Sequence, residues 1–413
     1  MPLIVFGARQ VGKTYALNEF GKSNYANVVL INLEANPLAR HAFDGDLNPH
    51  RVVQMLEAVA GESIQPGKTL LILDEIQSCE RALTALKSFC EEAPEYHVAA
   101  AGSLLGVAIN REKFSFPVGK VYELRMFPLD FEEFLWAIGK KSLADEIQYH
   151  FISNEKLESP LHELALECYK KYLIIGGMPA SVLEYLDSNS FVNVPVVLSR
   201  IQSEYVADMA KYSPAATSVK IRACYNSVPA QLAKENHKFQ YKVVQRGGSA
   251  TIFGESIEWL EYAGVVLKCK AVSQGNVPIA VYANQSNFKL YLSDVGMLTM
   301  QSGMPQSLIL SNINESNTFT GALVENYVAT ALACNGHPLY YWKNDNTAEL
   351  DFILQKGETV VPIEVKKGNR THAKSFSLFM KTYNPEYGIR ISTKNFGMSE
   401  GVKSVPLYAA HLI

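Results

Sequence analysis

Short apolar runs and amphipathic segments alternate along the first third of the chain. The apolar runs predict strands at residues 3–6, 27–34, 69–76 and 96–103, and a last strand is expected at residues 121–125. The segments between them predict helices at residues 15–20, 51–61 and 82–92. This alternation, with runs so apolar, is typical of a parallel sheet that helices cover on both faces. We therefore expect an α/β domain over residues 1–145.

The loop that follows the first run, from Gly7 to Thr14, has the form G-x-x-x-x-G-K-T. Gly7 and Gly12 allow the backbone to turn so that its N–H groups converge on phosphate oxygens, and the helix behind the loop adds a favourable dipole. Lys13 is expected to reach the β- and γ-phosphates, and the hydroxyl of Thr14 to bind Mg²⁺. The loop thus predicts a nucleoside triphosphate and Mg²⁺ as ligands.

The apolar run that starts at Thr69 ends in two acids, Asp74 and Glu75. Asp74 can hold the Mg²⁺ through a water, and Glu75 can polarise the attacking water as general base. An acid pair at this place favours an ATPase over a nucleotide kinase or a GTPase, so ATP is the expected nucleotide. The competing interpretation is a buried strand followed by a solvated acidic turn.

Ser103 ends the fourth predicted strand, and parallel sheets bind ligands at the carboxyl ends of their strands. It is a candidate sensor of the γ-phosphate, with a helix N-cap as the alternative role. We predict catalytic roles for Lys13 and Glu75, and metal binding for Thr14 and Asp74. The residues predicted to contact the nucleotide are Gly7, Ala8, Arg9, Gln10, Val11, Gly12, Lys13, Thr14, Tyr15, Asp74 and Ser103.

The middle of the chain predicts two further modules. Residues 146–190 read as mostly helical, with a break at Gly176-Gly-Met-Pro179, and fit a helical lid. Residues 191–275 fit a winged helix, with helices at 222–235 and 249–262 and a wing strand at 264–270. Lys238, Lys242 and Arg246 form a modest basic cluster there, which suits either a DNA backbone or the solvated face of a packing module.

The last block, residues 285–413, places acids on a predicted helix at 320–330 and on strands at 349–354 and 360–366. Two carboxylates on adjacent strands, Asp351 and Glu364, can hold a Mg²⁺ that lowers the pKa of its water and stabilises the leaving oxygen of a phosphodiester. Lys366 shares a strand face with Glu364 and can orient the nucleophile. With Glu325 on the helix, these residues predict a catalytic site; the alternative is a buried ion-pair network without turnover.

Composition narrows the class of protein only slightly. The chain has 413 residues, 48% apolar and 19% charged, which suits several globular domains. No apolar run approaches the length of a membrane span, and no signal peptide is visible. The six cysteines lack metal or disulfide spacing, so the cytoplasm is the expected compartment. A net charge of −3 excludes a globally basic coat for nucleic acid but leaves room for local patches.

Taken together, the motifs resemble those of a prokaryotic family of AAA-type P-loop ATPases that carry a C-terminal PD-(D/E)xK nuclease-like domain. The resemblance covers nearly the whole chain. It implies a AAA-type parallel sheet with a helical lid, then a winged-helix module and a restriction-endonuclease-like α/β domain. The matching segments are 7–14, 73–77, 102–103, 127–134, 176–179 and 289–296, together with Glu325, Asp351, Glu364 and Lys366.

The resemblance has one departure. The family usually has Gly-Arg before its last core strand, whereas this chain has Gly119-Lys120, so nucleotide sensing through that arginine would be altered. The candidates for an arginine finger are Arg81, Arg111 and Arg125.

Three functions fit the sequence. The first is an ATP-dependent nuclease acting on DNA, which Asp351, Glu364 and Lys366 favour. The second is an ATP-gated regulatory protein whose inactive nuclease-like domain only binds DNA or a protein partner, which the near-neutral charge favours. The third is a switch whose nucleotide-bound form assembles into a homo-oligomer.

Overall fold

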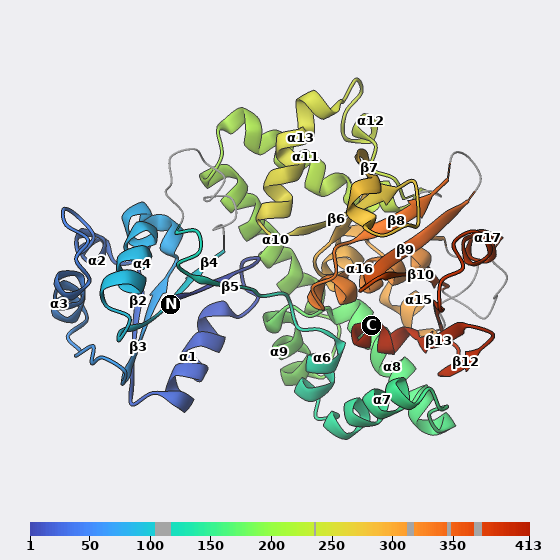
Figure 1. The fold of residues 1–413 in the computed structure, drawn as a ribbon, viewed down its shortest axis with the longest axis horizontal. Coiled ribbons are helices and arrows are strands. Elements are labelled where there is room, and N and C mark those ends of the chain that lie inside the picture. Colours follow the sequence, from blue (N-terminus) through green and yellow to red (C-terminus); the bar gives the residue numbers. More distant parts are fainter. Residues whose placement is uncertain (104–116, 235–236, 312–317, 345–347, 367–373) are drawn as a thin grey trace. The chain divides into compact units, whose positions relative to one another are not determined.

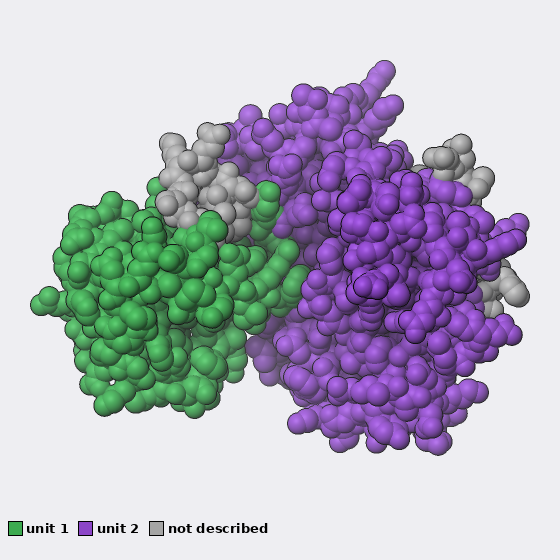
Figure 2. Space-filling view, viewed as in Figure 1, with its two compact units in different colours: residues 1–127, 262–264 green, residues 128–261, 265–413 purple. Residues whose placement is uncertain are grey.

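The computed structural model describes residues 1–103, 117–234, 237–311, 318–344, 348–366 and 374–413. The chain divides into two compact units, which are coloured separately in Figure 2. The first unit contains residues 1–127 together with Tyr262–Gly264. The second unit contains residues 128–261 and 265–413. No helix among the described residues is long and apolar enough to cross a membrane.

The first unit is built on a five-stranded parallel sheet in the order β2-β3-β4-β1-β5 (Figure 1). The predicted parallel α/β fold is therefore confirmed. The strands are β1 (Leu3–Phe6), β2 (Asn27–Asn32), β3 (Thr69–Asp74), β4 (His97–Gly102) and β5 (Tyr122–Arg125). The helices are α1 (Lys13–Asn24), α2 (Pro37–His41), α3 (Pro49–Ala60), the single turn η1 (Ile76–Ser78) and α4 (Glu80–Glu92).

The central strands β3 and β4 are buried on both faces, which explains why they read as continuous apolar runs, whereas the edge strand β5 is exposed. On β3, Leu71 and Leu73 pack into the core beneath α2, α3 and α4, whereas Leu70 and Ile72 pack with Leu17 of α1. Burying one such leucine contributes about 1.5–3 kcal/mol, so the alternating faces of β3 anchor both helical layers. The acids that follow β3 are thereby held at a fixed edge of the sheet.

The second unit contains a mixed eight-stranded sheet in the order β12-β13-β11-β10-β9-β8-β6-β7 (Figure 1). The strands are β6 (Val266–Val272), β7 (Ala283–Leu292), β8 (Tyr340–Lys343), β9 (Glu349–Lys356), β10 (Thr359–Val365), β11 (Gly388–Ser392), β12 (Gly397–Ser399) and β13 (Val402–Pro406). Helix α17 (Lys374–Tyr383) packs on β9 and β10, and α16 (Thr318–Cys334) packs on β6, β7 and β10.

The other helices of the second unit form a large helical part. They are α6 (Phe131–Ala137), α7 (Lys141–Ser153), α8 (Ser159–Ile175), α9 (Pro179–Ser188), α10 (Val194–Lys211), α11 (Ala215–Leu232), α12 (Tyr241–Val244), α13 (Ala250–Tyr262), α14 (Val295–Ser302) and α15 (Gln306–Ser311), with the short turns η2 (Ile279–Tyr282) and η3 (Leu407–Leu412). The helices predicted at 222–235 and 249–262 correspond to α11, which begins earlier, and to α13.

The predicted wing strand has a different place. It is β6, an inner strand of the eight-stranded sheet that pairs antiparallel with β7 and parallel with β8. The wing is therefore wrong, because this strand finds its partners in segments that come later in the sequence, across the predicted boundary between residues 275 and 285. The helices predicted as a lid belong to the second unit, where α8 packs on α14. Their role as a lid and the four predicted domain boundaries stay predictions.

Three motifs of the sequence meet at one buried carboxylate, Asp294. Its Oδ2 accepts the backbone N–H of Gly177 at 2.6 Å, and its Oδ1 caps α14 by accepting the N–H of Met297 at 2.8 Å. A Cβ at Gly176 would lie 2.3 Å from Asp294, and one at Gly177 would lie 1.9 Å from the carbonyl oxygen of Leu129. Burial raises the pKa of Asp294 to about 6. The paired glycines thus allow α8, α14 and the segment before α6 to approach closely.

Candidate functional site

The loop between β1 and α1 needs its glycines for geometric reasons. Gly7 has φ +152°, and a Cβ there would lie 2.1 Å from the carbonyl oxygen of Met126. Gly12 has φ +97° directly before α1. Because larger residues rarely adopt such backbone angles, the loop can keep its tight path only with glycine at these positions. Tyr15, on the first turn of α1, is 73% exposed.

A second segment, distant in sequence, lies against this loop. Gly264, which belongs to the first unit, has φ +73°, and a Cβ there would lie 3.1 Å from the backbone nitrogen of Ala8. The residues Tyr262–Gly264 therefore approach the phosphate-loop backbone closely. No motif in the sequence indicated this approach.

The amine of Lys13 lies inside the loop. It donates hydrogen bonds to the carbonyl oxygens of Gly7 at 3.0 Å and Ala8 at 2.8 Å, and the residue is only 7% exposed. A buried ammonium group held by two loop carbonyls places a positive charge within the loop. The position fits the role predicted for Lys13, which is contact with phosphate oxygens.

Thr14 and Asp74 come together although they are 60 positions apart. The Thr14 hydroxyl donates to Asp74 Oδ1 at 3.0 Å. Asn32, the register partner of Asp74 on β2, donates from Nδ2 to Asp74 Oδ2 at 3.3 Å. A hydroxyl and a carboxylate are oxygen donors that Mg²⁺ accepts, so Thr14 and Asp74 fit this ion, while Asn32, whose oxygen accepts the N–H groups of Glu34 and Ala35, positions Asp74. Asn32 was missed in the sequence, although a polar residue at the end of an apolar strand was a usable signal.

Glu75 follows β3 directly, with φ +50°, and its Oε2 accepts a short hydrogen bond from Gln77 Nε2. Burial raises the pKa of Glu75 and the neighbouring charge of Asp74 raises it further, while Gln77, Lys13 and Arg9 act in the opposite direction. A carboxylate with increased proton affinity next to Asp74, a predicted metal-binding residue, suits a general base.

Ser103 lies just beyond β4, whose Gly102 is the register partner of Phe6. Ser103 and Gly7 therefore stand at the same edge of the sheet. The Ser103 side chain is buried, and its hydroxyl has no hydrogen-bond partner among the described residues. A buried hydroxyl that no described residue engages, at the edge where phosphates are predicted to bind, suits the predicted sensor role, and the N-cap role stays a prediction.

The arginine candidates differ in their surroundings. Arg81 donates to the carbonyl oxygens of Phe43 and Gly45, which supports the loop before α3. The guanidinium of Arg125 lies 5.0 Å from the ring centre of Phe127. Arg111 lies outside the described residues. The assignment of an arginine finger stays open.

A second group of charged residues lies in the second unit, around Glu325 on α16. Glu325 is 6% exposed and accepts hydrogen bonds from Lys289 Nζ at 2.9 Å, from His237 Nδ1 at 2.7 Å and from the Tyr291 hydroxyl. Burial alone would raise the pKa of Glu325, but Lys289 and His237 hold it well below its usual range. Lys289 is 1% exposed and also contacts Glu349 at 3.0 Å.

Asp351 lies where β9 and β10 stop pairing. The register of the two strands ends at Phe352 and Ile363, and beyond it Asp351 Oδ2 accepts the backbone N–H of Val365 at 2.7 Å. Burial raises the pKa of Asp351 to about 6, and repulsion from Glu325 contributes to the same shift. The carboxylate therefore sits in surroundings where a nearby cation would be favourable.

Glu364 and Lys366 form a direct ion pair, with Lys366 Nζ 3.0 Å from Glu364 Oε1. Glu364 is also the register partner of Arg390 on β11, whose Nε lies 3.6 Å from Glu364 Oε2. The structure thus joins Glu364 with Lys366, and Glu325 electrostatically with Asp351. Among the described residues, no three His, Cys, Asp or Glu side chains lie so that they could share a metal ion.

A metal at Asp351 and Glu364 stays a prediction. Two carboxylates are compatible with Mg²⁺, which commonly binds through one or two of them and keeps several waters. The sequence did not indicate that the cluster also contains His237, Lys289, Tyr291, Glu349 and Arg390. Lys289-x-Tyr291 on one strand was a usable signal, because residues two apart on a strand share a face.

Comparison with known proteins assigns the N-terminal part to a class. Residues 1–135 match the family model described as AAA domain, so this part of the chain is a AAA-type P-loop domain. Residues 166–308 and 320–410 match two families described only as domains of unknown function, DUF8612 and DUF4143. No curated protein matches the chain.

Among solved structures, a Walker-type ATPase of Pyrococcus abyssi is 14% identical, with a TM-score of 0.44 over 73% of this chain and 90% of that one. The ORC2 protein of Aeropyrum pernix, solved as ADPNP–ADP complexes, is 11% identical, with a TM-score of 0.38 over 78% of this chain and 87% of that one.

Proposed function

We propose that this protein is an Mg²⁺-dependent ATPase whose AAA-type domain controls the second unit. The contact that carries the proposal is the hydrogen bond from the Thr14 hydroxyl to Asp74, formed beside a loop that encloses the amine of Lys13. These two oxygen groups come from motifs far apart in the sequence. Their meeting is what a phosphate-and-magnesium site requires.

In the proposed mechanism, the loop N–H groups and Lys13 hold the β- and γ-phosphates of ATP. Thr14 and Asp74 would hold Mg²⁺, which when bound neutralises charge that develops on the phosphates. Glu75 takes a proton from the attacking water, a role that its raised pKa supports. The Ser103 hydroxyl is available to donate to a γ-phosphate oxygen.

The test compares three variants of the full chain for binding of a fluorescent ATP analogue and for release of phosphate. Lys13→Ala should lose binding, whereas Glu75→Gln should bind normally and hydrolyse about 100-fold or more slowly. Lys22→Ala, on the exposed side of the same helix, is the matched control and should behave as wild type. Wild type that neither binds nor hydrolyses ATP would overturn the proposal, and a fully active Glu75→Gln would overturn the role of Glu75.

For the second unit, the candidate activity is Mg²⁺-dependent cleavage of DNA in a nuclease-like site. It is supported by the location of Asp351 beside Glu325 and by the Glu364–Lys366 pair on the neighbouring strand. The alternative is an ATP-gated regulatory protein with a catalytically inactive nuclease-like domain. That alternative is supported by the ion pairs that already engage Glu325 and Glu364.

One assay separates the two. Supercoiled and single-stranded DNA are incubated with Mg²⁺ or Mn²⁺, with and without ATP, using wild type and Asp351→Ala. Cleavage that disappears in the variant supports the nuclease. Hydrolysis of ATP without any cleavage supports the regulatory protein. Light scattering with and without ATP tests the remaining partner, a homo-oligomer, which a mass independent of ATP would contradict.

A further inference from the structure

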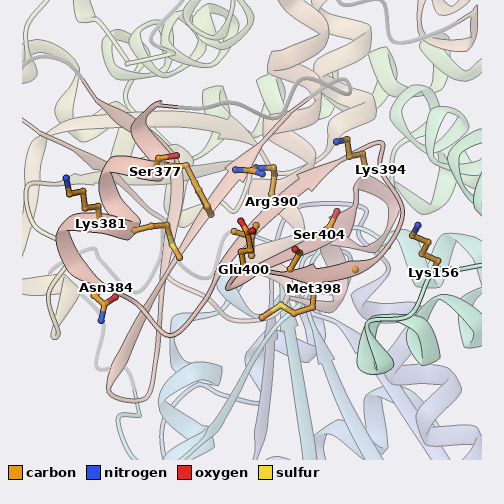
Figure 3. Close-up of a pocket in the computed structure, with 14 residues that line it drawn as sticks. Lys156, Ser377, Lys381, Asn384, Arg390, Lys394, Met398, Glu400 and Ser404 are labelled. Atoms are coloured by element: carbon orange, nitrogen blue, oxygen red, sulfur yellow. The ribbon is translucent and has the colours of Figure 1, made fainter.

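A pocket of about 900 Å³ opens in the second unit between α17 and the strands β11, β12 and β13 (Figure 3). Its cationic lining residues come from four places: Lys156 from the segment after α7, Lys381 from α17, Arg390 from β11 and Lys394 from the turn after β11. The one acidic residue in the lining is Glu400. The pocket therefore carries a clear excess of positive charge in a protein whose net charge is −3.

The three lysines of this pocket are exposed, and no described residue forms an ion pair or a side-chain hydrogen bond with their amines. Cations that outnumber anions on a concave surface raise the potential there and attract anionic ligands. The lysines Lys381 and Lys394 lie on opposite sides of the pocket, with Arg390 and Glu400 between them (Figure 3). Positive charge is thus spread along the pocket rather than gathered at one point.

Arg390 is the most constrained of these cations. Its guanidinium lies 5.0 Å from the ring centre of Phe376, and its Nε faces Glu364 at 3.6 Å without forming a hydrogen bond. Among the described residues, no hydrogen bond engages its two terminal nitrogens. A guanidinium that lies against an aromatic ring and beside a carboxylate, with its two terminal nitrogens unengaged by described residues, is well suited to bind a phosphate group through two parallel hydrogen bonds.

We propose that this pocket binds consecutive phosphates of a single nucleic-acid strand. Cations on opposite sides of the pocket suit linked phosphates better than a single phosphate ion. Phe376, Met380 and Met398 add apolar surface for sugars or bases. The choice of a nucleic acid over a free polyphosphate rests on the proposed action of the second unit on DNA. The proposal that the pocket binds phosphate groups does not depend on that action.

The same arginine connects the pocket to the Glu364–Lys366 pair. A phosphate bound to the terminal nitrogens of Arg390 neutralises the positive charge of this guanidinium beside Glu364. Lys366 is then the remaining cationic partner of Glu364 among the described residues. The strand would thereby be held next to the carboxylates at which cleavage is proposed. Binding of phosphate in the pocket and of a cation at Glu364 are expected to favour one another, because the coupling is reciprocal.

The experiment measures fluorescence anisotropy of a fluorescein-labelled octathymidylate with the full chain in EDTA. A Lys13→Ala background removes binding of phosphates by the ATP-site loop. The pocket variant is Lys381→Gln with Lys394→Gln, two exposed positions at which loss of folding is not expected. The matched control is Lys141→Gln with Lys220→Gln, which removes the same charge from exposed helix positions away from the pocket.

The pocket variant should bind about tenfold more weakly, and its slope of log affinity against log salt should fall by about 1.4, which is 0.7 for each lost phosphate contact with a single strand. Arg390→Gln should weaken binding at least as much. Equal affinity and equal slope for the pocket and control variants would overturn the proposal. If pyrophosphate binds and the oligonucleotide does not, the proposal that the ligand is a nucleic acid is overturned. Neither result depends on ATP hydrolysis or DNA cleavage, which the earlier assays measure.

Discussion

Replacing Asp351 by asparagine should stabilise the second unit at neutral pH, although it removes a candidate catalytic residue. The carboxyl group has its pKa raised from 3.8 to about 6, mainly by burial and then by the charge of Glu325. Asparagine keeps an oxygen that can accept the N–H of Val365 but carries no charge. The substitution therefore removes an unfavourable charge without breaking the contact that holds the side chain.

The magnitude follows from the shift. A change of about two pKa units corresponds to about 3 kcal/mol at 1.36 kcal/mol for each unit. Because part of the Asp351 side chain reaches solvent, screening reduces this value, and about 1–3 kcal/mol is expected. A folded-state pKa above the unfolded value means that the ionised acid costs stability. The benefit of the variant is thus absent below about pH 4, grows between about pH 4 and 6, and is complete above pH 6.

The assay is urea unfolding in EDTA, followed by tryptophan fluorescence. Trp136, Trp259 and Trp342 are the three tryptophans of the chain and all belong to the second unit, so the signal reports that unit. Asp187→Asn, at an exposed position of α9, is the control and should change little at any pH. A loss of stability at about pH 8, or an equal gain at about pH 4 and 8, would refute the reasoning from burial and repulsion.

Three further predictions concern the stability of the second unit. Lys289→Met leaves the buried carboxylates of Glu325 and Glu349 without their cation, and should lower the free energy of unfolding by about 3–5 kcal/mol in the same urea assay. A decrease below about 1 kcal/mol would contradict the expected contribution of these ion pairs. Gly177→Ala places a methyl group 1.9 Å from the carbonyl oxygen of Leu129 and should lower the free energy of unfolding by about 3 kcal/mol. An unchanged urea midpoint would contradict this steric argument. The pKa of His237 is raised by Glu325 despite burial, so the His237–Glu325 ion pair stabilises the fold at low pH and is lost as the pH rises through that pKa. His237→Gln should therefore reduce stability at about pH 5.5 and change it little at about pH 9. A loss of stability that does not depend on pH would disprove this prediction.

The first unit was largely predictable from sequence because its signals are local. A strand buried on both faces reads as an apolar run whatever its neighbours are, as Leu70–Leu73 show. The phosphate-loop motif is likewise contained within eight consecutive residues, so it can be recognised without knowledge of the fold. The expected proximity of Thr14 and Asp74 is present as a hydrogen bond. Asn32 was missed because its importance comes from register with Asp74, which only the assembled sheet defines.

The second unit was less predictable because its key contacts join distant segments. Strand β6 has the same residues whether it forms a wing or an inner strand, and only pairing with β7 and β8 decides between them. Lys289 reads as a lone charge in an apolar strand, and its burial is tolerable only because Glu325 and Glu349 lie opposite. Period-two patterns show which residues share a face, but they do not show which distant carboxylate faces them.

The three residues Tyr262–Gly264 limit how the first unit can be exchanged between proteins as a separate domain. They belong to the first unit, yet the chain enters them from α13 and leaves them for β6. Gly264 also approaches the phosphate-loop backbone at Ala8. A gene fragment that stops after Phe127 would therefore encode a nucleotide domain with one of its pieces missing. Swapping this ATPase module between proteins by a single crossover would leave that piece behind, so the two units are expected to be inherited together.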